Sequence, residues 1–289
     1  MSRKDTMKLL NAGPSERGWH QFENAARCMR LWAFNQKTDM KFPVTAPLVK
    51  GSLIHQGLAH YYLDDDDYYS PHDSIAMLAE HEAARTSDVN EANLWLSSVA
   101  GIQDAMSAYI QRYRTCSWKT IAVEQELRAN IPRDRSEARY SGGKALESDR
   151  FLFTQRADLI VEDAHGFKWI VDHKSCYRIT SKTLRQYILS GQFLGYQVSG
   201  RRLYGKKFGG VILNRIKLSE PYGFDRVAID PAPAAVSGFV KMLQMTENRI
   251  QQWNHLDDPM DYPPVFSDQI CYGKYGPCQA FELCRWGKE

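Results

Sequence analysis

Alternating apolar and polar positions indicate two neighbouring strands between Phe151 and Lys174. In the first strand the apolar residues recur at every second position, as Phe151, Phe153, Ala157, Leu159 and Val161. This period of two predicts one apolar face and sends Arg156 and Asp158 to the other face. The connection from Glu162 to Gly166 has the composition of a turn, so we predict an antiparallel hairpin.

The second strand of this hairpin carries charged residues within an apolar run. Its period of two places Ile170, Asp172 and Lys174 on one face and Trp169, Val171 and His173 on the other. The hairpin can therefore bring the carboxylates of Asp158 and Asp172 together, where they repel unless a proton or a cation lies between them. Two interpretations stay open on the pattern alone, namely a metal site or an ordinary Asp172–Lys174 ion pair on an edge strand with Asp158 capping a turn.

Periodicity elsewhere predicts helices around further strands. The predicted helices are Ser15–Gln36, a segment that starts at Gly51, Ser74–Arg85, Ala92–Arg114, Thr180–Tyr204 and Pro233–Trp253. The predicted strands are Lys119–Ile131, Gly209–Arg215 and Phe224–Ile229, and the predicted loops are Asp64–Asp67 and Pro132–Glu147. This order of elements predicts an α/β core with an added helical region.

Local signals refine two of these helices. Ser52 is predicted to cap the second helix. Gly191 and Gly195 fall inside the predicted helix Thr180–Tyr204, at a cost of about 1 kcal/mol each relative to alanine, which is tolerable where the backbone approaches a sheet or a ligand closely. Gln192 and Tyr196 are four residues apart and would project together, either as a glutamine at the solvent edge beside a partly buried tyrosine or as a pair that touches a phosphate backbone.

Two further residues have side chains that can bind a metal. For His55, an ordinary core or surface histidine is favoured over a metal ligand when the residue is considered alone. For Glu124, an exposed position on its strand is favoured over an additional acid at the site.

Three cysteines cluster near the carboxyl terminus. Cys271, Cys278 and Cys284 have six and then five residues between them. A structural zinc site normally contains a pair separated by two to four residues, whereas an iron-sulfur cluster is bulkier and needs four thiolates. The fourth thiolate would come from Cys28, Cys116 or Cys176. Three reduced, unliganded thiols remain the alternative.

Composition sets only broad limits. The chain of 289 residues is 43% hydrophobic and 25% charged, as in ordinary globular proteins, and its net charge of +3 permits a polyanionic partner without requiring one. Six cysteines are too sparse for a disulfide scaffold. The amino terminus lacks an apolar signal segment and no run approaches the ~18 apolar residues of a membrane span, so we expect a cytoplasmic protein with no membrane contact.

Taken together, these residues resemble the PD-(D/E)XK nuclease superfamily, and within it the RecB-like nucleases that carry an iron-sulfur staple. The matching pieces are GSLIH ending in His55, RAD ending in Asp158, VDHK with Asp172 and Lys174, QFLGY with Gln192 and Tyr196, ARCMRLW with Cys28, and the terminal cysteine trio. The sequence departs from the family's pattern in two ways. Asp172 stands where many members have Glu, and the three terminal cysteines lack the close cysteine pair that many stapled members have.

The resemblance implies a restriction-endonuclease-like mixed central sheet flanked by helices, with an amino-terminal helical region and a carboxyl-terminal cysteine-rich staple. The expected parts are a helical region over residues 1–117, the nuclease core over 118–231, and a helix with the iron-sulfur segment over 232–289, forming one compact whole.

The resemblance also implies a chemistry. Asp158, Asp172, His55 and the backbone carbonyl of His173 would hold Mg²⁺ or Mn²⁺, and Lys174 would act beside them in catalysis. A cluster, expected to be 4Fe-4S, would be held by Cys28, Cys271, Cys278 and Cys284. Gln192 and Tyr196 would contact DNA.

The implied activity is that of a metal-dependent deoxyribonuclease, specifically an exonuclease that leaves 5′-phosphates. Its substrate would be single-stranded DNA or duplex ends. A protein partner in recombination, repair or CRISPR adaptation, and an oligomeric state, are both compatible with the resemblance. The alternatives are a non-catalytic DNA-binding or assembly subunit that keeps the fold and the cluster, and a structural protein stapled by zinc.

Overall fold

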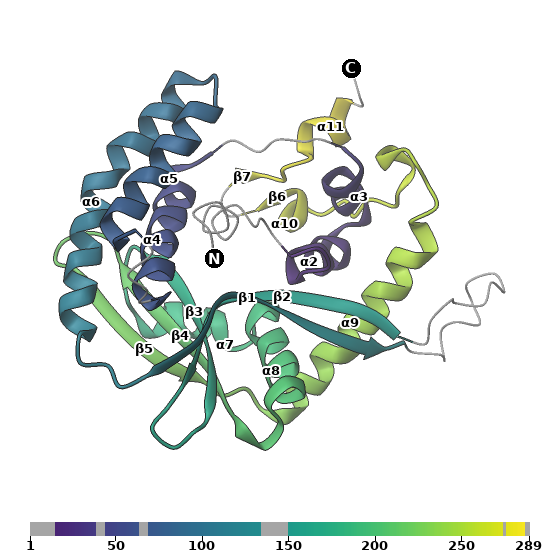
Figure 1. Cartoon of the computed structure of the whole chain (residues 1–289). Coiled ribbons are helices and arrows are strands. Elements are labelled where there is room, and N and C mark those ends of the chain that lie inside the picture. The colour runs from purple at the N-terminus through teal and green to yellow at the C-terminus, as the bar shows by residue number, and fades with distance from the viewer. Residues whose placement is uncertain (1–14, 39–43, 64–68, 134–149, 274–275, 287–289) are drawn as a thin grey trace. The chain divides into compact units, whose positions relative to one another are not determined.

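A five-stranded sheet contains the predicted hairpin (Figure 1). Its strands, in spatial and chain order, are β1 (Lys119–Pro132), β2 (Arg150–Glu162), β3 (Lys168–Cys176), β4 (Phe208–Lys217) and β5 (Gly223–Ile229). The pairs β2–β3 and β4–β5 are antiparallel and β3–β4 is parallel, so the sheet is mixed. The hairpin and the three other predicted strands are confirmed, as is a mixed sheet flanked by helices.

The computed structural model describes residues 15–38, 44–63, 69–133, 150–273 and 276–286. The chain divides into two compact units. The first, here called the sheet unit, includes Val44–Leu127 and Gln155–Ala232. The second, here called the cysteine unit, consists of Glu16–Pro43, Arg128–Thr154 and Pro233–Glu289. The three parts predicted from the sequence, with boundaries after residues 117 and 231, stay a prediction.

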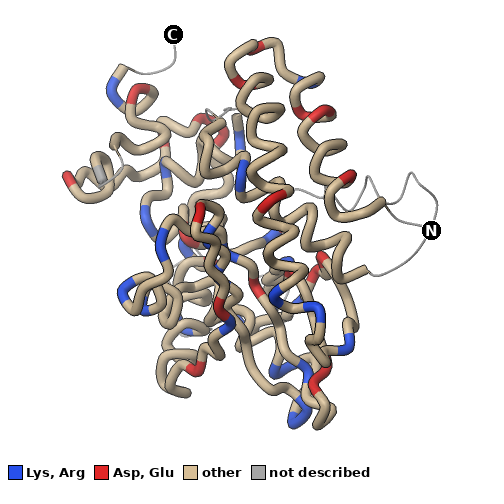
Figure 2. The backbone as a smooth tube through the Cα atoms, turned by 90° about the vertical axis from the view of Figure 1, so that its left-hand side faces the viewer, with Lys and Arg blue, Asp and Glu red and all other residues tan. Residues whose placement is uncertain are grey.

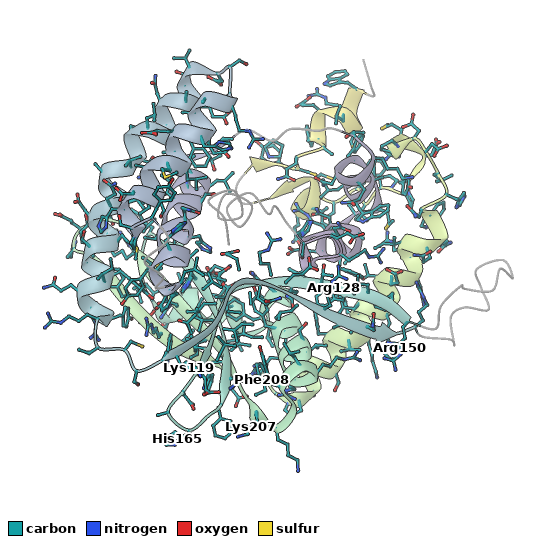
Figure 3. The ribbon with its side chains drawn as sticks, viewed as in Figure 1. Lys119, Arg128, Arg150, His165, Lys207 and Phe208 are labelled. Atoms are coloured by element: carbon teal, nitrogen blue, oxygen red, sulfur yellow. The ribbon has the colours of Figure 1, made fainter. Side chains whose placement is uncertain are left out.

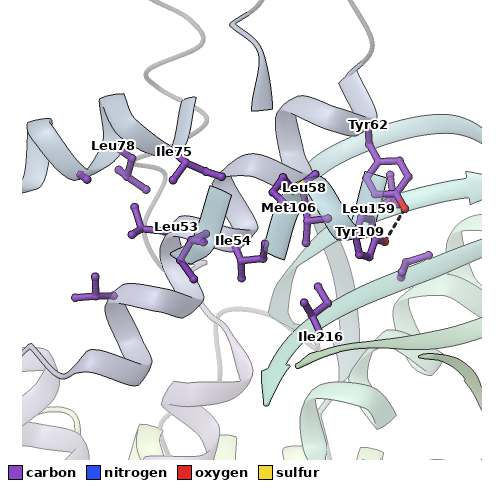
Figure 4. Close-up of a cluster of buried hydrophobic side chains, with 14 of the residues drawn as sticks. Leu53, Ile54, Leu58, Tyr62, Ile75, Leu78, Met106, Tyr109, Leu159 and Ile216 are labelled. Atoms are coloured by element: carbon purple, nitrogen blue, oxygen red, sulfur yellow. Dashed lines mark hydrogen bonds between the residues drawn. The ribbon is translucent and has the colours of Figure 1, made fainter. Parts of the chain in front are cut away.

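Helices cover both faces of the sheet within the sheet unit. On one face lie α4 (Ala46–Leu63), α5 (Pro71–Arg85) and α6 (Val89–Tyr113), and on the other lie α7 (Ser181–Ile188) and α8 (Gly191–Tyr204). Figure 4 shows the first of these interfaces, where apolar side chains of the three long helices pack on Leu159 and Ile216 of the sheet. Burial of each such side chain contributes about 1.5–3 kcal/mol, which holds the helices on the sheet.

The opposite face uses the other residues of the same strands. Ile170 of β3 packs against Phe193 and Tyr196 of α8, whereas its neighbour Val171 packs on the first face. This confirms the predicted period of two in β3. Gly195 lets α8 approach closely, because an added Cβ there would lie 2.5 Å from the side-chain oxygen of Gln155.

Charged residues are spread over the chain. Figure 2 shows Lys and Arg interspersed with Asp and Glu along the backbone. The net charge of +3 therefore does not by itself identify a face that binds a polyanion. Figure 3 marks His165, in the turn between β2 and β3, together with Lys207 and Phe208 where β4 begins. The Phe208 ring occupies the space beside Gly200 of α8, which is too narrow for a side chain larger than hydrogen.

Apart from the end of β1 and the start of β2, the described part of the cysteine unit consists of helices and very short strands. Its elements are α2 (Trp19–Arg27), α3 (Met29–Lys37), α9 (Pro233–Trp253), the 3₁₀ helix η3 (Pro259–Asp261), α10 (Asp268–Cys271), β6 (Tyr272–Gly273), β7 (Gly276–Pro277) and α11 (Phe281–Trp286). Buried Glu247 of α9 accepts hydrogen bonds from Arg17 and from Arg133 (3.1 Å), and also from Gln251 (2.9 Å). This buried carboxylate therefore joins three segments that lie far apart in the sequence.

Two predicted helices are interrupted in the structure. The segment Ser15–Gln36 breaks at Cys28, which has an extended backbone (φ −163°, ψ 121°) between α2 and α3. Periodicity missed the break because each half keeps its own apolar stripe. The segment Thr180–Tyr204 breaks before Gly191, where the Ser190 hydroxyl caps α8 by accepting a hydrogen bond from the Phe193 amide. Gly191 is thus the first residue of a helix and not an interior one.

The remaining helix predictions differ in accuracy. The helix expected from Gly51 begins at Ala46, so Ser52 lies inside α4 and the predicted cap is wrong. The helix Pro233–Trp253 is confirmed, and α5 and α6 begin three residues earlier than predicted. The loop predicted at Asp64–Asp67, and most of the loop at Pro132–Glu147, lie outside the described residues. None of the described helices combines the length and apolar character needed to cross a bilayer.

Candidate active site

Asp158 of β2 is fixed by the neighbouring strand. The register of β2 with β3 runs from Glu162 opposite Lys168 to Leu159 opposite Val171. At the end of this register, the His173 amide donates a hydrogen bond of 2.6 Å to Asp158 Oδ2. The Asp158 carboxylate therefore accepts the hydrogen bond that a backbone carbonyl of β2 would accept if the β2–β3 pairing continued.

Asp172 of β3 is fully buried and contacts three side chains. Lys174 Nζ lies 2.7 Å from Asp172 Oδ2. Gln192 Nε2 donates to Asp172 Oδ1 at 2.8 Å, and the Tyr196 hydroxyl lies 3.0 Å from the same oxygen. The Tyr196 hydroxyl also lies 2.7 Å from the carbonyl oxygen of Arg156, so its single proton has two acceptors. Helix α8 thus holds the Asp172 carboxylate from one side.

The charges of these groups depend on one another. Burial raises the pKa of Asp172, and nearby Asp158 raises it further, against the opposing effect of Lys174. Burial alone would raise the pKa of Asp158 too, but His55, His173 and Lys174 together hold it below its usual value. Burial would lower the pKa of Lys174, yet Asp172 and Asp158 raise it above its usual value. Lys174 is therefore a cation at neutral pH.

His55 of α4 faces Asp158. Its Nδ1 lies 3.6 Å from Asp158 Oδ2, and its ring meets the His173 ring edge-on at 5.9 Å between centroids. His173 itself is buried, and burial, with a smaller effect of His55, lowers its pKa to about 3. The His173 ring is therefore neutral at physiological pH.

Glu124 of β1 joins His55 and Asp158, contrary to its predicted exposed position. One ligand atom from each of these three residues lies within 4.8 Å of the other two. Burial, and then the charge of Asp158, raise the pKa of Glu124 to about 8. The alternating pattern of β1 gave no sign of this, because Glu124 has a positive φ of 50° that interrupts the period of two.

This donor set suits a hard divalent cation. Carboxylate oxygens are the ligands that Mg²⁺ and Mn²⁺ prefer, and imidazole nitrogen suits Mn²⁺ as well. The three close donors of His55, Glu124 and Asp158, together with the nearby buried carboxylate of Asp172, fit such an ion better than they fit a group of charges exposed to solvent. In the described part of the chain, no second group of His, Cys, Asp and Glu meets this distance criterion.

The predicted cluster ligands all lie in the cysteine unit. Buried Cys28 belongs to an apolar cluster with Leu31, Phe34 and Ala280, against which Cys278 and Cys284 pack. Burial raises the pKa of the Cys284 thiol, Arg30 opposes this shift, and Cys28 and Cys278 make smaller contributions that raise it. The Cys271 thiol donates to the Val265 carbonyl at 3.3 Å.

Backbone hydrogen bonds tie these cysteines together. The Cys278 amide donates to the Cys271 carbonyl at 2.7 Å, across the short pair β6–β7. No three cysteine sulfurs among the described residues are as close as the donors of the His55 group. Cys116 and Cys176, the other two candidates for a fourth ligand, belong to the sheet unit. The set Cys28, Cys271, Cys278 and Cys284 stays a prediction.

Comparison with known families defines the class of protein. The model of the PD-(D/E)XK nuclease superfamily matches residues 20–285, which include all the candidate site residues named above. The chain therefore belongs to the PD-(D/E)XK nuclease superfamily. No curated protein sequence matches the chain.

Of two solved structures that align with this chain, one supports the fold. A crystal structure from Eubacterium rectale, described as that of a "Putative exonuclease", aligns with a TM-score of 0.56 and 11% identity, covering 100% of this chain and 94% of the other. The structure of SSO0001 aligns over 83% of this chain and 87% of the other, at 13% identity and a TM-score of 0.31. At such low identity the first alignment supports a common fold, and the second carries no argument.

Proposed function

We propose that this protein is a metal-dependent deoxyribonuclease that acts as an exonuclease and leaves 5′-phosphates. The observation that carries the proposal is the convergence of the half-buried Asp158, the buried Asp172 and the cation of Lys174 at one end of the β2–β3 pair. A binding role gives no reason to keep these two acids close together, because their mutual repulsion costs stability. The name of the Eubacterium rectale relative is compatible with exonuclease activity.

Mg²⁺ or Mn²⁺ would be held by Asp158, Asp172, His55 and the His173 carbonyl, and Glu124 is a further candidate ligand. Such an ion supplies a Lewis acid that polarises the scissile phosphate and lowers the pKa of a bound water. The short hydrogen bond from the His173 amide keeps Asp158 oriented before any ion is present. Glu124 adds a carboxylate at ligand distance from His55 and Asp158.

Lys174 would serve as a cation and not as a base, because its pKa is raised by the two acids. In that role it orients the attacking water or stabilises the negative charge that develops on the phosphate. Gln192 and Tyr196 hold Asp172 through its Oδ1. Tyr196 is almost fully buried, which limits its access to DNA. Direct contact of Tyr196 and Gln192 with DNA stays a prediction.

For the four cysteines Cys28, Cys271, Cys278 and Cys284 we propose an iron-sulfur cluster of the 4Fe-4S type. Support comes from the apolar surroundings that Cys28 shares with Cys278 and Cys284, and from the hydrogen bond that ties Cys271 to Cys278. An iron-sulfur cluster is larger than a single ion, so its thiolates can stand further apart than the ligands of one cation. Iron and acid-labile sulfide in anaerobically purified protein would support this cluster, whereas zinc alone would replace it with a zinc staple.

The decisive experiment measures degradation of end-labelled single-stranded and duplex DNA with Mg²⁺, Mn²⁺ or EDTA. We expect metal-dependent loss of label that Asp172→Ala or Lys174→Ala reduces by about 100-fold or more, with DNA binding retained. Lys168→Ala is the matched control, because Lys168 lies on the same strand and pairs with Glu162 away from the acids. Undiminished cleavage by both variants would refute the proposed catalytic site.

A second candidate function is a DNA-binding or assembly subunit without catalysis. It would be favoured if folded, metal-loaded protein binds DNA ends and cleaves neither substrate. Release of mononucleotides from one labelled end would instead establish an exonuclease and its polarity.

A further inference from the structure

A hydrogen-bonded network lies behind the candidate active site, and sequence reasoning gave no sign of it. Asn214 of β4 stands opposite His173 of β3 in the parallel pair. The Asn214 Nδ2 group lies 2.7 Å from His173 Nδ1 and 2.8 Å from the Tyr109 hydroxyl. Both hydrogens of the amide are then used, and His173 Nδ1 must act as the acceptor. The neutral His173 ring therefore carries its proton on Nε2.

Arg226 of β5 continues this network. One of its guanidinium nitrogens donates to the Tyr62 hydroxyl at 2.6 Å and to the Tyr109 hydroxyl at 3.0 Å. The two tyrosine hydroxyls are 2.8 Å apart. Because Asn214 and Arg226 both donate to the Tyr109 oxygen, the hydroxyl proton of Tyr109 is left for Tyr62. Donor counting thus assigns a direction to every bond in the network.

The cation of Arg226 is held by polar and aromatic groups. Its guanidinium stands 3.5 Å from the ring centre of Tyr113 and 4.1 Å from that of Trp118, and a second nitrogen donates to Cys116 Sγ at 3.0 Å. These cation–π contacts fix the guanidinium plane. Burial raises the pKa of both Tyr62 and Tyr109, so they are neutral hydroxyls at physiological pH.

The network reaches the candidate ligands by two routes. Tyr62 follows His55 by seven residues on α4, which is two helical turns along the same face. The His173 ring touches both of them, since it stacks on Tyr62 at 5.9 Å and 11° and meets His55 edge-on. The amide of the same His173 donates to Asp158. A shift of His173 as a whole would therefore displace both His55, through the ring, and Asp158, through the backbone amide.

We propose that Asn214, Tyr109, Tyr62 and Arg226 are positioning residues that hold His173, and through it His55 and Asp158, in the geometry that binds the divalent cation. The inference rests on the proposed function, because the cation is part of it. Outer groups that orient metal ligands typically change metal affinity or activity 10- to 100-fold when they are lost. The four residues come from four elements, so the network also fixes α4 and α6 on the sheet at this point.

The first test measures the Mn²⁺ dissociation constant of the full chain by electron paramagnetic resonance. We expect Tyr109→Phe and Tyr62→Phe, each of which removes one hydroxyl, to weaken Mn²⁺ binding about 10-fold in protein that is still folded. Tyr113→Phe is the matched control, because Tyr113 serves Arg226 through its ring, which phenylalanine retains. The proposal would be overturned if both variants bound Mn²⁺ with dissociation constants within twofold of that of the wild-type protein.

The second test does not require metal. Long-range ¹⁵N NMR of histidine-labelled protein should show His173 Nδ1 without a proton and Nε2 with one. Asn214→Leu should abolish this preference and weaken Mn²⁺ binding in parallel. A His173 ring protonated on Nδ1 in the unchanged chain would overturn the inference even if the nuclease is real.

Failure of the inference is separable from failure of the proposed function. If Asp158→Asn abolishes Mn²⁺ binding but Tyr109→Phe and Tyr62→Phe do not weaken it, the metal site is supported and the positioning role of the network is refuted. If the unchanged chain does not bind Mn²⁺ at all, the proposed metal site falls and the inference with it.

Discussion

The sheet unit and the cysteine unit assemble their candidate ligands in different ways. In the sheet unit, Asp158, Asp172 and Lys174 project from adjacent strands, and hydrogen bonds from the protein hold the two acids. In the cysteine unit, Cys28 comes from an extended residue between two helices, and the other three come from elements of two to six residues and their connections. Neither α10 nor α11 contains a buried residue.

This difference between the units indicates what stabilises each candidate site. Regular strand pairing and two helical layers fix the acids, so this site is organised by the fold. The terminal cysteine segment instead depends on individual hydrogen bonds, such as those from Arg27 to the Ile270 carbonyl and from Arg30 to the Met260 carbonyl, both at 2.7 Å. Closing a loop between the two ends of a chain has an entropic cost that a bound cluster can offset. Three predictions test this contrast.

The largest expected effect is at Glu247, in the cysteine unit. Glu247→Ala should destabilise that unit by about 3–5 kcal/mol, because it removes the buried carboxylate with which Arg17 and Arg133 both pair. Urea unfolding followed by hydrogen exchange measures the loss, with Glu80→Ala on the exposed surface of α5 as the control. Mn²⁺ affinity should remain unchanged, and its collapse would show that the two units do not keep their sites independently.

An intermediate effect is expected for the proposed cluster. Cys278→Ala should lower the melting temperature of iron-loaded protein by roughly 5–10 °C, the shift expected for a loss of a few kcal/mol in a chain of this size. Cys176→Ala, which changes a thiol of the sheet unit, should have a much smaller effect. A fully stable but inactive Cys278→Ala protein would argue for a redox or DNA-contact role of the cluster.

The smallest expected effect concerns Glu124. Its pKa near 8 means that the metal-free carboxyl is protonated at pH 7 and must lose its proton to bind a cation. Mn²⁺ affinity should therefore rise as the pH increases from 6.5 to 8.5, with proton release measurable by calorimetry in buffers of different ionisation enthalpy.

Replacement of this carboxyl should remove the pH dependence. Glu124→Gln should flatten the profile and weaken binding by up to about 10-fold, whereas Glu126→Gln on the same strand should leave both unchanged. An equally steep profile in Glu124→Gln would mean that another group takes up the proton. The same raised pKa implies that metal-free protein gains stability from Glu124 at low pH and loses it as the pH rises towards 8.

The sequence by itself determined the elements and most of the residues at the acid site. Periods of two and of three to four predicted the hairpin, β1, β4, β5 and α9, because burying one face of an element requires a regular apolar pattern. The motifs that contain His55, Asp158, Asp172 and Lys174 identified the superfamily, which is confirmed. Helix ends were less well predicted, since a break such as that at Cys28 keeps the apolar spacing on both sides.

Only the tertiary structure decided which residues surround these motifs. Glu124 reaches His55 and Asp158 because a positive φ turns its side chain out of the strand alternation, and no local pattern encodes that turn. The network of Asn214, Tyr109 and Arg226 depends on side chains from different elements that meet at one buried point. Sequence periodicity records which face of an element is buried, but the partner on that face is set by how the elements pack.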